Sequence, residues 1–196
     1  SAPRPLLVGL HGCTQTAASY DWGSGWSDLA RRHDFALLMP EQRPLNNPHR
    51  CFTWFQTADT RRNSGEVLSV RQMIGHMLET QTIDPARIHV VGLSAGGAMT
   101  AALLAAYPDV FASGAVVAGL TAGAASSAHE AFEAMSHGRK RPARQWGDIV
   151  RQGVRHEGRW PRIAIWHGDA DQVVAQANAG SLVAQWTDVH GVGPEP

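Results

Sequence analysis

The segment Arg87–Gly97 constrains this chain more than any other feature of its sequence. A short β-branched run leads directly into Gly92-Leu-Ser94-Ala-Gly96, and small residues with helical character follow from Ala98 to Ala106. A strand that turns at a serine between two glycines and enters a helix at once is typical of a nucleophile elbow. The glycines leave room for the sharp turn and for the helix to pack close behind it. The N-terminus of that helix would point free N–H groups at Ser94, where they can stabilise negative charge.

Apolar runs alternate with helical patterns along the rest of the chain. Strands are predicted at Pro5–Leu10, Phe35–Met39, Ile88–Val91, Ser113–Ala118 and Arg162–Trp166. Helices are predicted at Trp26–Arg32, Glu66–Thr80, Ala98–Ala106, His129–Met135 and Ala175–Thr187. Strands that alternate with helices favour an α/β fold, with a parallel sheet and helices on both of its faces.

Two long segments show no clear period. Glu41–Gly65 is rich in Pro, Asn, Arg and aromatic residues, and we interpret it as a long functional loop, the 41–65 loop. Gly119–Pro161 holds small residues, one weak helical stretch and the basic run Arg139-Lys-Arg141, which is most simply a solvated loop. We expect this second segment to be an insertion over the mouth of a site, at about residues 119–161.

Composition excludes several classes of partner. Lys+Arg and Asp+Glu balance at 17 each, so nothing indicates binding to nucleic acid or to an anionic membrane. No apolar run approaches the roughly 20 residues that span a bilayer. Residues 1–196 favour a single domain. Cys13 and Cys51 are the two cysteines, and by themselves they allow a disulfide, two thiols or part of a metal site. Their positions in separate loops, without close C-x-x-C spacing, argue against a metal.

A serine hydroxyl needs a histidine to take its proton and an acid to orient that histidine. In folds with this elbow the acid follows the serine in the chain and lies after a later strand. The matching segment is His167-Gly-Asp169-Ala-Asp171, at the end of the fifth predicted strand. We predict Asp171 as the acid, because it lies further past the strand end, and Asp169 is the alternative. Either aspartate would otherwise cap the following helix.

The oxyanion that forms on the substrate needs two N–H donors. We predict the backbone N–H of Ala95, directly after the serine, and that of Cys13, in the loop Leu10–Thr14 after the first strand. We call Leu10–Thr14 the oxyanion loop. His11 lies in this loop, before the serine, which is the wrong order for the base. We interpret His11 as a structural residue that holds the loop.

The chain resembles a known family at this point. The motifs that carry the resemblance stand in the expected order and span nearly the whole chain: Leu10–Gln15, Arg50–Phe55, Gly92–Gly97 and His167–Asp171. They are similar to those of polyhydroxybutyrate depolymerase-type esterases, which are related to feruloyl and acetyl-xylan esterases. The resemblance implies an α/β-hydrolase fold and serine-catalysed hydrolysis of carboxylic esters, with small-molecule or polymeric ester substrates and no cofactor.

The resemblance has three further implications. It implies a Cys13–Cys51 disulfide that ties the 41–65 loop to the oxyanion loop. It also implies a secreted or periplasmic enzyme. Trp54 matches an aromatic block of the family and would either stack on the substrate or serve only in packing.

The chain departs from the family at both ends. A complete fold has two strands before Pro5 and one after the last predicted helix, so we expect a fold truncated at both ends. The base should follow that last strand, beyond Pro196. His190 is the only histidine after Asp171. The preceding helix of about 13 residues would carry His190 about 20 Å from the site, at about 1.5 Å per residue.

Other functions remain open on these residues. A peptidase or thioesterase would use the same fold, because a fold does not fix the bond that is cleaved. A binding protein that lacks the base would keep the pocket without turnover. The sequence does not choose among polyhydroxyalkanoate, feruloyl and acetyl esters.

Overall fold

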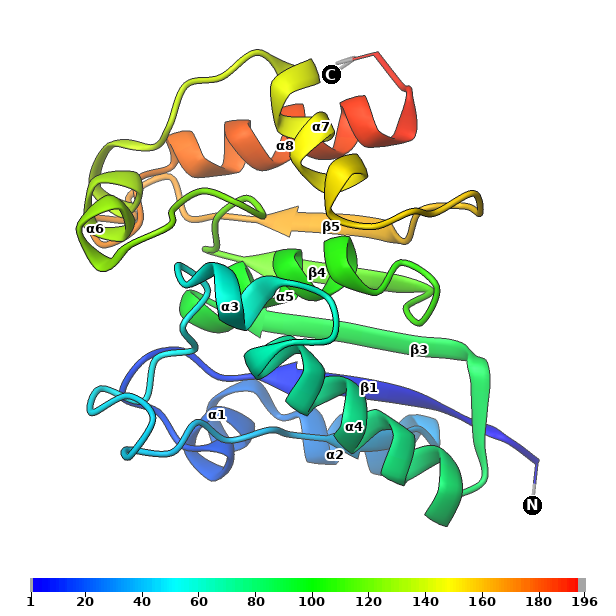
Figure 1. The fold of residues 1–196 in the computed structure, drawn as a ribbon. Helices are drawn as coiled ribbons and strands as arrows, with labels where there is room; N and C mark the ends of the chain where they lie inside the picture. Colours follow the sequence, from blue (N-terminus) through cyan, green and yellow to red (C-terminus); the bar gives the residue numbers. More distant parts are fainter. Residues whose placement is uncertain (1, 194–196) are drawn as a thin grey trace.

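The computed structural model describes residues 2–193. Its strands form one sheet in the order β2-β1-β3-β4-β5, and every pairing is parallel (Figure 1). The strands are β1 (Arg4–Leu10), β2 (Ala36–Leu38), β3 (Ile83–Leu93), β4 (Ser113–Val117) and β5 (Arg162–Trp166). The predicted α/β fold with a parallel sheet is confirmed, and each predicted strand lies within a few residues of an observed one.

Helices lie on both faces of this sheet. They are α1 (Ala17–Ser24), α2 (Trp26–His33), α3 (Thr57–Thr60), α4 (Gly65–Thr80), α5 (Ala95–Ala106), α6 (Ala128–His137), α7 (Ala143–Gly153) and α8 (Ala177–His190). In Figure 1, α4 and α5 lie in front of the sheet, and α1 and α2 lie behind it. α7 and α8 pack against each other beside β5.

The core lies between the sheet and α5. Almost every residue of α5 is buried, including Leu103 and Leu104, because β3, β4, β1, α4 and α7 surround this helix. Leu6, Val8 and Leu10 of β1 are fully buried beside it. Each buried side chain of this size contributes about 1.5–3 kcal/mol relative to an exposed one. The elbow serine at the start of α5 therefore sits on the most tightly held element of the molecule.

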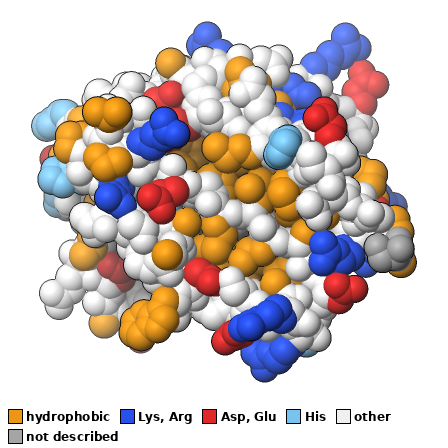
Figure 2. Space-filling model, turned by 90° about the horizontal axis from the view of Figure 1, so that it is seen from below, with side chains coloured by type: hydrophobic (Ala, Val, Ile, Leu, Met, Phe, Trp, Pro, Cys, Tyr) orange, Lys and Arg blue, Asp and Glu red, His pale blue; other side chains and the backbone are white. Residues whose placement is uncertain are grey.

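Each outer strand, β2 and β5, pairs on one side only within residues 2–193. On the β2 side of the molecule, apolar side chains gather at the centre of the face, with charged side chains around them (Figure 2). On the other side, residues alternate between exposed and half-buried along the whole of β5. The Trp166 side chain there is 66% exposed.

Three helices were not predicted from the sequence: α1, α7 and the four-residue α3, which lies in the 41–65 loop. α1 begins at a capping box, in which the Thr16 and Ser19 side chains bond each other's backbone N–H groups, and ends at Gly25 in the left-handed conformation. The sequence did not predict α1, because the residues between these two end signals show only a weak apolar pattern. α7 lies in the segment that we expected to be an insertion. It buries Trp146 and Val150 against α5 and α8, so part of that segment belongs to the helical layer.

The weak helical stretch in the same segment is confirmed as α6. This helix lies at the carboxyl edge of the sheet (Figure 1). The rest of the proposed cover over the site stays a prediction. No helix within residues 2–193 is both long enough and apolar enough to cross a membrane.

Candidate active site

Ser94 is the single residue between β3 and α5, and its backbone is strained. It has φ 55° and ψ −117°, a conformation that costs about 1–3 kcal/mol in a residue other than glycine. Two backbone bonds hold it there: Ser94 N donates to Val117 O at 2.9 Å, and Ser94 O accepts from Ala98 N at 2.9 Å. The Ser94 hydroxyl makes no hydrogen bond within residues 2–193, so it is free to react.

The glycines of the motif are required by close packing. A β-carbon on Gly92 would overlap the backbone of Gly96, and one on Gly96 would overlap the carbonyl oxygens of Leu10 and His11. The elbow thus lies directly against the end of β1. Because backbone atoms form both contacts, no side-chain movement would relieve them.

The oxyanion loop lies beside the serine. A β-carbon added to Gly12 would come 3.6 Å from Ser94 Cβ. Within the described residues, no acceptor bonds the backbone N–H of Cys13 or that of Ala95. The two groups predicted as oxyanion donors therefore belong to the residue after Ser94 and to the residue after Gly12, and both hydrogens are unused within the described residues.

The oxyanion loop is tied to the 41–65 loop at two points. Cys13 and Cys51 form a disulfide, as the family resemblance implied. Thr14, which has a positive φ of 64°, donates its backbone N–H to His49 O at 2.7 Å. These two links hold the loop at Cys13 and at the residue that follows it.

Asp171 has one carboxylate oxygen engaged and one available. Its Oδ1 accepts from the backbone N–H groups of Val173 and Val174, both at 2.9 Å. These two bonds, with a smaller effect of the nearby His167, lower the pKa of Asp171 below its usual value. Its Oδ2 has one long contact, 3.5 Å from His167 Nε2, and no hydrogen bond within the described residues. Asp169, the alternative acid, is exposed on the same loop.

His167 shapes this loop from within. Its side chain is only 3% exposed, and its Nε2 lies 2.8 Å from Val174 O. A carbonyl accepts only, so Nε2 carries the proton and donates it. His167 is therefore a buried residue that holds the loop His167–Val174, which we call the acid loop.

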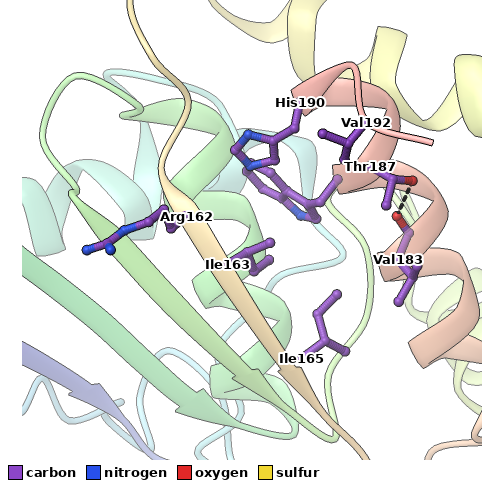
Figure 3. A pocket seen from close by; sticks show the side chains of 8 residues that line it. Arg162, Ile163, Ile165, Val183, Thr187, His190 and Val192 are labelled. Carbon is purple, nitrogen blue, oxygen red and sulfur yellow. Dashed lines mark hydrogen bonds between the residues drawn. The ribbon is translucent and has the colours of Figure 1, made fainter. Parts of the chain in front are cut away.

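His190 lies far from these groups. It ends α8 and lines a cavity of about 440 Å³ with Arg162 and Ile163, the first residues of β5 (Figure 3). Asp171 follows the opposite end of the same strand. His190 is therefore at the wrong end of the sheet to take a proton from Ser94.

Trp54 is buried, with 6% of its surface exposed, and it meets the Phe55 ring edge-on at 5.6 Å. Trp54 therefore packs in the interior of the protein. A stacking function toward substrate stays a prediction.

A buried polar network behind the oxyanion loop was not predicted. Glu66, at the start of α4, accepts bonds from the Gln42 side chain, from Thr53 N at 2.8 Å and from Thr53 Oγ1 at 2.7 Å. Burial raises the pKa of Glu66, and nearby Asp59 adds to this, although the bonds from Thr53 and Gln42 oppose it. These residues are too far apart in the chain to form a local pattern. The sequence indicated only that Gln42 and Thr53 lie in the 41–65 loop, which we interpreted as functional.

The elbow, the free N–H groups and the acid loop meet at the carboxyl edge of one parallel sheet. A family model described as "Esterase PHB depolymerase" matches residues 2–193. The chain belongs to this family. It is 46% identical, over all of its length, to "Poly(3-hydroxyalkanoate) depolymerase C" of Paucimonas lemoignei, of which it covers 47%. It is 33% identical to "Feruloyl esterase B" of Thermothelomyces thermophilus, with 96% of this chain and 66% of that protein aligned.

A solved structure supports the fold. The chain superposes on "Acetyl xylan esterase from Aspergillus awamori" with a TM-score of 0.88 and 24% identity, covering 97% of this chain and 71% of the other. This α/β-hydrolase fold agrees with the sequence prediction. The chain spans about half the length of the depolymerase and about two thirds of the feruloyl esterase. Within residues 2–193, no group of three or more His, Cys, Asp or Glu residues is placed to hold a metal ion.

Proposed function

We propose that this chain carries the nucleophile, the acid and the oxyanion donors of a serine carboxylic-ester hydrolase. One observation carries the proposal: Ser94 is held in a strained turn with a free hydroxyl, and the N–H groups of Ala95, beside it, and of Cys13, next to Gly12, have no acceptor within residues 2–193. A fold stabilises such strain only where the rest of the structure fixes it, and strained residues cluster at active sites.

The proposed reaction has two steps. Ser94 Oγ attacks the ester carbonyl carbon, and the Cys13 and Ala95 N–H groups bind the oxygen as it becomes negative. The alcohol leaves with a proton and an acyl-serine remains. Water then attacks that acyl group and releases the acid, with the serine proton restored.

Asp171 would hold the imidazole of the base. Its Oδ2 has room for a hydrogen bond, since Oδ1 already accepts two backbone bonds. β4 separates β3 from β5, so the ends of these two strands lie about 10 Å apart at about 4.8 Å per strand. An imidazole placed between Ser94 and Asp171 would bridge much of that distance. In folds with this elbow the base follows the acid in the chain, and His190, the only histidine after Asp171, lies at the opposite end of β5. We therefore place this base outside residues 2–193.

We infer the substrate class from the names of the relatives. Their names point to poly(3-hydroxyalkanoate), feruloyl and acetylxylan esters, and all three have a carboxylic ester as the bond to be cleaved. We propose a secreted or periplasmic location, because the Cys13–Cys51 disulfide forms and persists in oxidising compartments.

The test is an ester panel with matched variants. Polyhydroxybutyrate suspension, a methyl ferulate and acetylated xylan are offered to the wild-type chain, to Ser94→Ala and to the pair Asp171→Asn and Asp169→Asn. With imidazole added to take the place of the base, we expect release of acid in the wild type and in Asp169→Asn, slower release in Asp171→Asn, and no release above the buffer rate in Ser94→Ala. Equal rates with and without the Ser94 hydroxyl would refute the mechanism. Binding without any turnover would instead favour a non-catalytic binding protein, and cleavage of amides or thioesters alone would favour a peptidase or thioesterase.

A further inference from the structure

Thr53 lies in the 41–65 loop, with its side chain between two carboxyl groups. It is only 4% exposed. Its Oγ1 lies 2.6 Å from Asp59 Oδ2 in α3 and 2.7 Å from Glu66 Oε1 at the start of α4. Both distances are typical of strong hydrogen bonds between a hydroxyl and a carboxyl oxygen. One hydroxyl therefore joins α3 to α4, and the reaction proposed above makes no use of it.

Two ionised carboxylates would leave one of these contacts without a proton. A threonine hydroxyl has a single proton to donate, and an ionised carboxylate only accepts. Thr53 would then donate to Glu66 or to Asp59. The other pair of oxygens would face each other at hydrogen-bond distance with no proton between them. One added proton on a carboxyl group turns both contacts into hydrogen bonds.

The contacts of Glu66 fit a proton on its Oε1. Glu66 then donates to Thr53 Oγ1, and Thr53 donates its own proton to Asp59 Oδ2. The other bonds of Glu66 persist, because Oε2 still accepts from Thr53 N at 2.8 Å and Oε1 keeps a lone pair for the Gln42 side chain. The Gln42 amide is oriented to donate there, since its oxygen accepts from Asn46 Nδ2 at 2.9 Å.

No positive side chain is paired with the two acids. Within residues 2–193, neither Asp59 nor Glu66 forms an ion pair. The Arg62 guanidinium, which follows α3, bonds Asp109 instead. The other charged side chains on the adjoining segments are Arg61, after α3, and Glu41 and Arg43, which line a cavity of about 320 Å³ beside Glu66.

The surroundings of Glu66 also favour its protonated form. Burial is the largest influence and raises the pKa of Glu66. The bonds from Thr53 and Gln42 act in the opposite direction, and the charge of Asp59 adds to the rise. A buried carboxyl beside a like charge holds its proton longer than an exposed one.

We propose that Asp59 and Glu66 share a single proton through the Thr53 hydroxyl, and that this proton fastens α3 to the start of α4. The backbones approach closely here, because a β-carbon on Gly65, which has φ 53°, would overlap the backbone and the carboxylate of Asp59. When Glu66 releases the proton to water, Thr53 donates to Glu66 alone. Asp59 then loses this donor and faces a like charge. The junction of α3 with α4 is therefore closed in acid and loosens as the pH rises.

The first test follows the carboxyl carbons of Asp59 and Glu66 in the folded wild-type chain by ¹³C NMR as the pH is raised. We expect Glu66 to ionise at a pH above about 4.3, the ordinary value for a glutamate, and the Asp59 signal to move in the same step. Ionisation of Glu66 at the ordinary value would overturn the proposal. No ester needs to be hydrolysed, so this result is independent of the proposed function.

Two variants of Thr53 isolate the hydroxyl. Thr53→Ser keeps it and should reproduce both results. Thr53→Val keeps the shape of the side chain without the hydroxyl, so the Asp59 signal should lose most of its movement in the Glu66 step. An Asp59 signal that responds equally in Thr53→Val would show that the hydroxyl does not link the two acids, against the proposal.

Asp59→Asn tests the pair without a change at Thr53. The asparagine oxygen still accepts from the hydroxyl, but the like charge beside Glu66 is gone. Glu66 should therefore ionise at a lower pH in Asp59→Asn than in the wild type. An unchanged Glu66 midpoint would contradict the sharing of one proton, whether or not Thr53→Val folds.

Amide hydrogen exchange follows the junction itself. Asp59 N donates to Gln56 O at 2.9 Å, so its exchange reports whether α3 keeps its place. After correction for the intrinsic effect of pH, we expect the Asp59 amide to exchange about tenfold faster above the Glu66 step than below it. The amide of Leu103, fully buried in α5, should be unchanged. No change at Asp59, or an equal change at Leu103, would refute the fastening of α3 by this proton.

Discussion

Gly12 and Ser94 lie in contact, although 82 positions in the chain separate them: a β-carbon on Gly12 would come 3.6 Å from Ser94 Cβ. The contact exists because β1 and β3 are neighbours in register, with Leu10 beside Gly92. The loops that leave the two strands are therefore side by side. This adjacency brings the oxyanion loop beside Ser94.

Ser94→Gly should stabilise the fold relative to Ser94→Ala. Alanine keeps the β-carbon that strains φ 55°, whereas glycine adopts this conformation freely. Relief of about 1–3 kcal/mol of strain is partly offset by about 0.4–1 kcal/mol from the greater freedom of glycine in the unfolded chain. Urea unfolding should therefore show Ser94→Gly about 1 kcal/mol more stable than Ser94→Ala. Equal midpoints would mean that the elbow stores no strain.

Gly96→Ala should damage the fold. Its β-carbon would overlap the Leu10 and His11 carbonyl oxygens, and separating α5 from β1 should cost about 3 kcal/mol or more. Gly23→Ala in α1 is the matched control, because a β-carbon there meets nothing within 4 Å. The control should be neutral or up to about 1 kcal/mol more stable, since alanine favours helix. A Gly96→Ala protein with the wild-type melting temperature would contradict the packing described here.

Loss of the Cys13–Cys51 disulfide should lower stability and loosen the oxyanion loop. The cysteines are separated by 38 positions, for which the chain-entropy estimate is about 4 kcal/mol. Thermal unfolding with and without a thiol reductant should show a large shift in the wild type. The Cys13→Ser, Cys51→Ser double variant should already be destabilised and should not respond to the reductant. A wild type that is indifferent to the reductant, with its thiols shown to be free, would refute this prediction.

Stability should fall with rising pH through the titration of Glu66. Burial raises the pKa of Glu66 in the folded protein, so the folded state holds this proton after the unfolded chain has lost it. The unfolded chain loses it near the ordinary value of about 4.3. Between that pH and the raised folded value, each rise in pH stabilises the unfolded state more than the folded one. Glu66→Gln does not titrate, so the wild type should lose stability relative to it across this window. Parallel curves for the two proteins would show that Glu66 is not perturbed.

Local patterns accounted for most of the fold and for the strained turn at Ser94. The elbow around Ser94, the strands and the helix Gly65–Thr80 each carry a signal within a few residues, from glycine spacing or apolar periodicity. The family resemblance added the Cys13–Cys51 pairing. The elbow, the strands and the helix were predictable because the residues that determine each of them are contiguous in the chain.

Features made by distant residues were not predictable. The His11–Gln42 bond joins residues 31 positions apart, and the Gln42–Glu66 bond joins residues 24 apart. No periodicity marks such pairs, because each partner is one polar residue in an irregular segment. α7 was missed for a different reason: Trp146, Ile149 and Val150 stand at helical spacing, but the segment that holds them was interpreted as an insertion.

The most direct test of the proposed mechanism is the mass of the peptide that contains Ser94, measured after exposure to an activated ester. The wild-type chain and Ser94→Ala are incubated with p-nitrophenyl butyrate, with and without imidazole to take the place of the base, then quenched in acid and digested. The account predicts a butyryl group on the peptide that contains Ser94, formed faster with imidazole, and no such group in Ser94→Ala. An unmodified Ser94 peptide under all conditions, or an equal butyryl mass on other residues in both proteins, would contradict it.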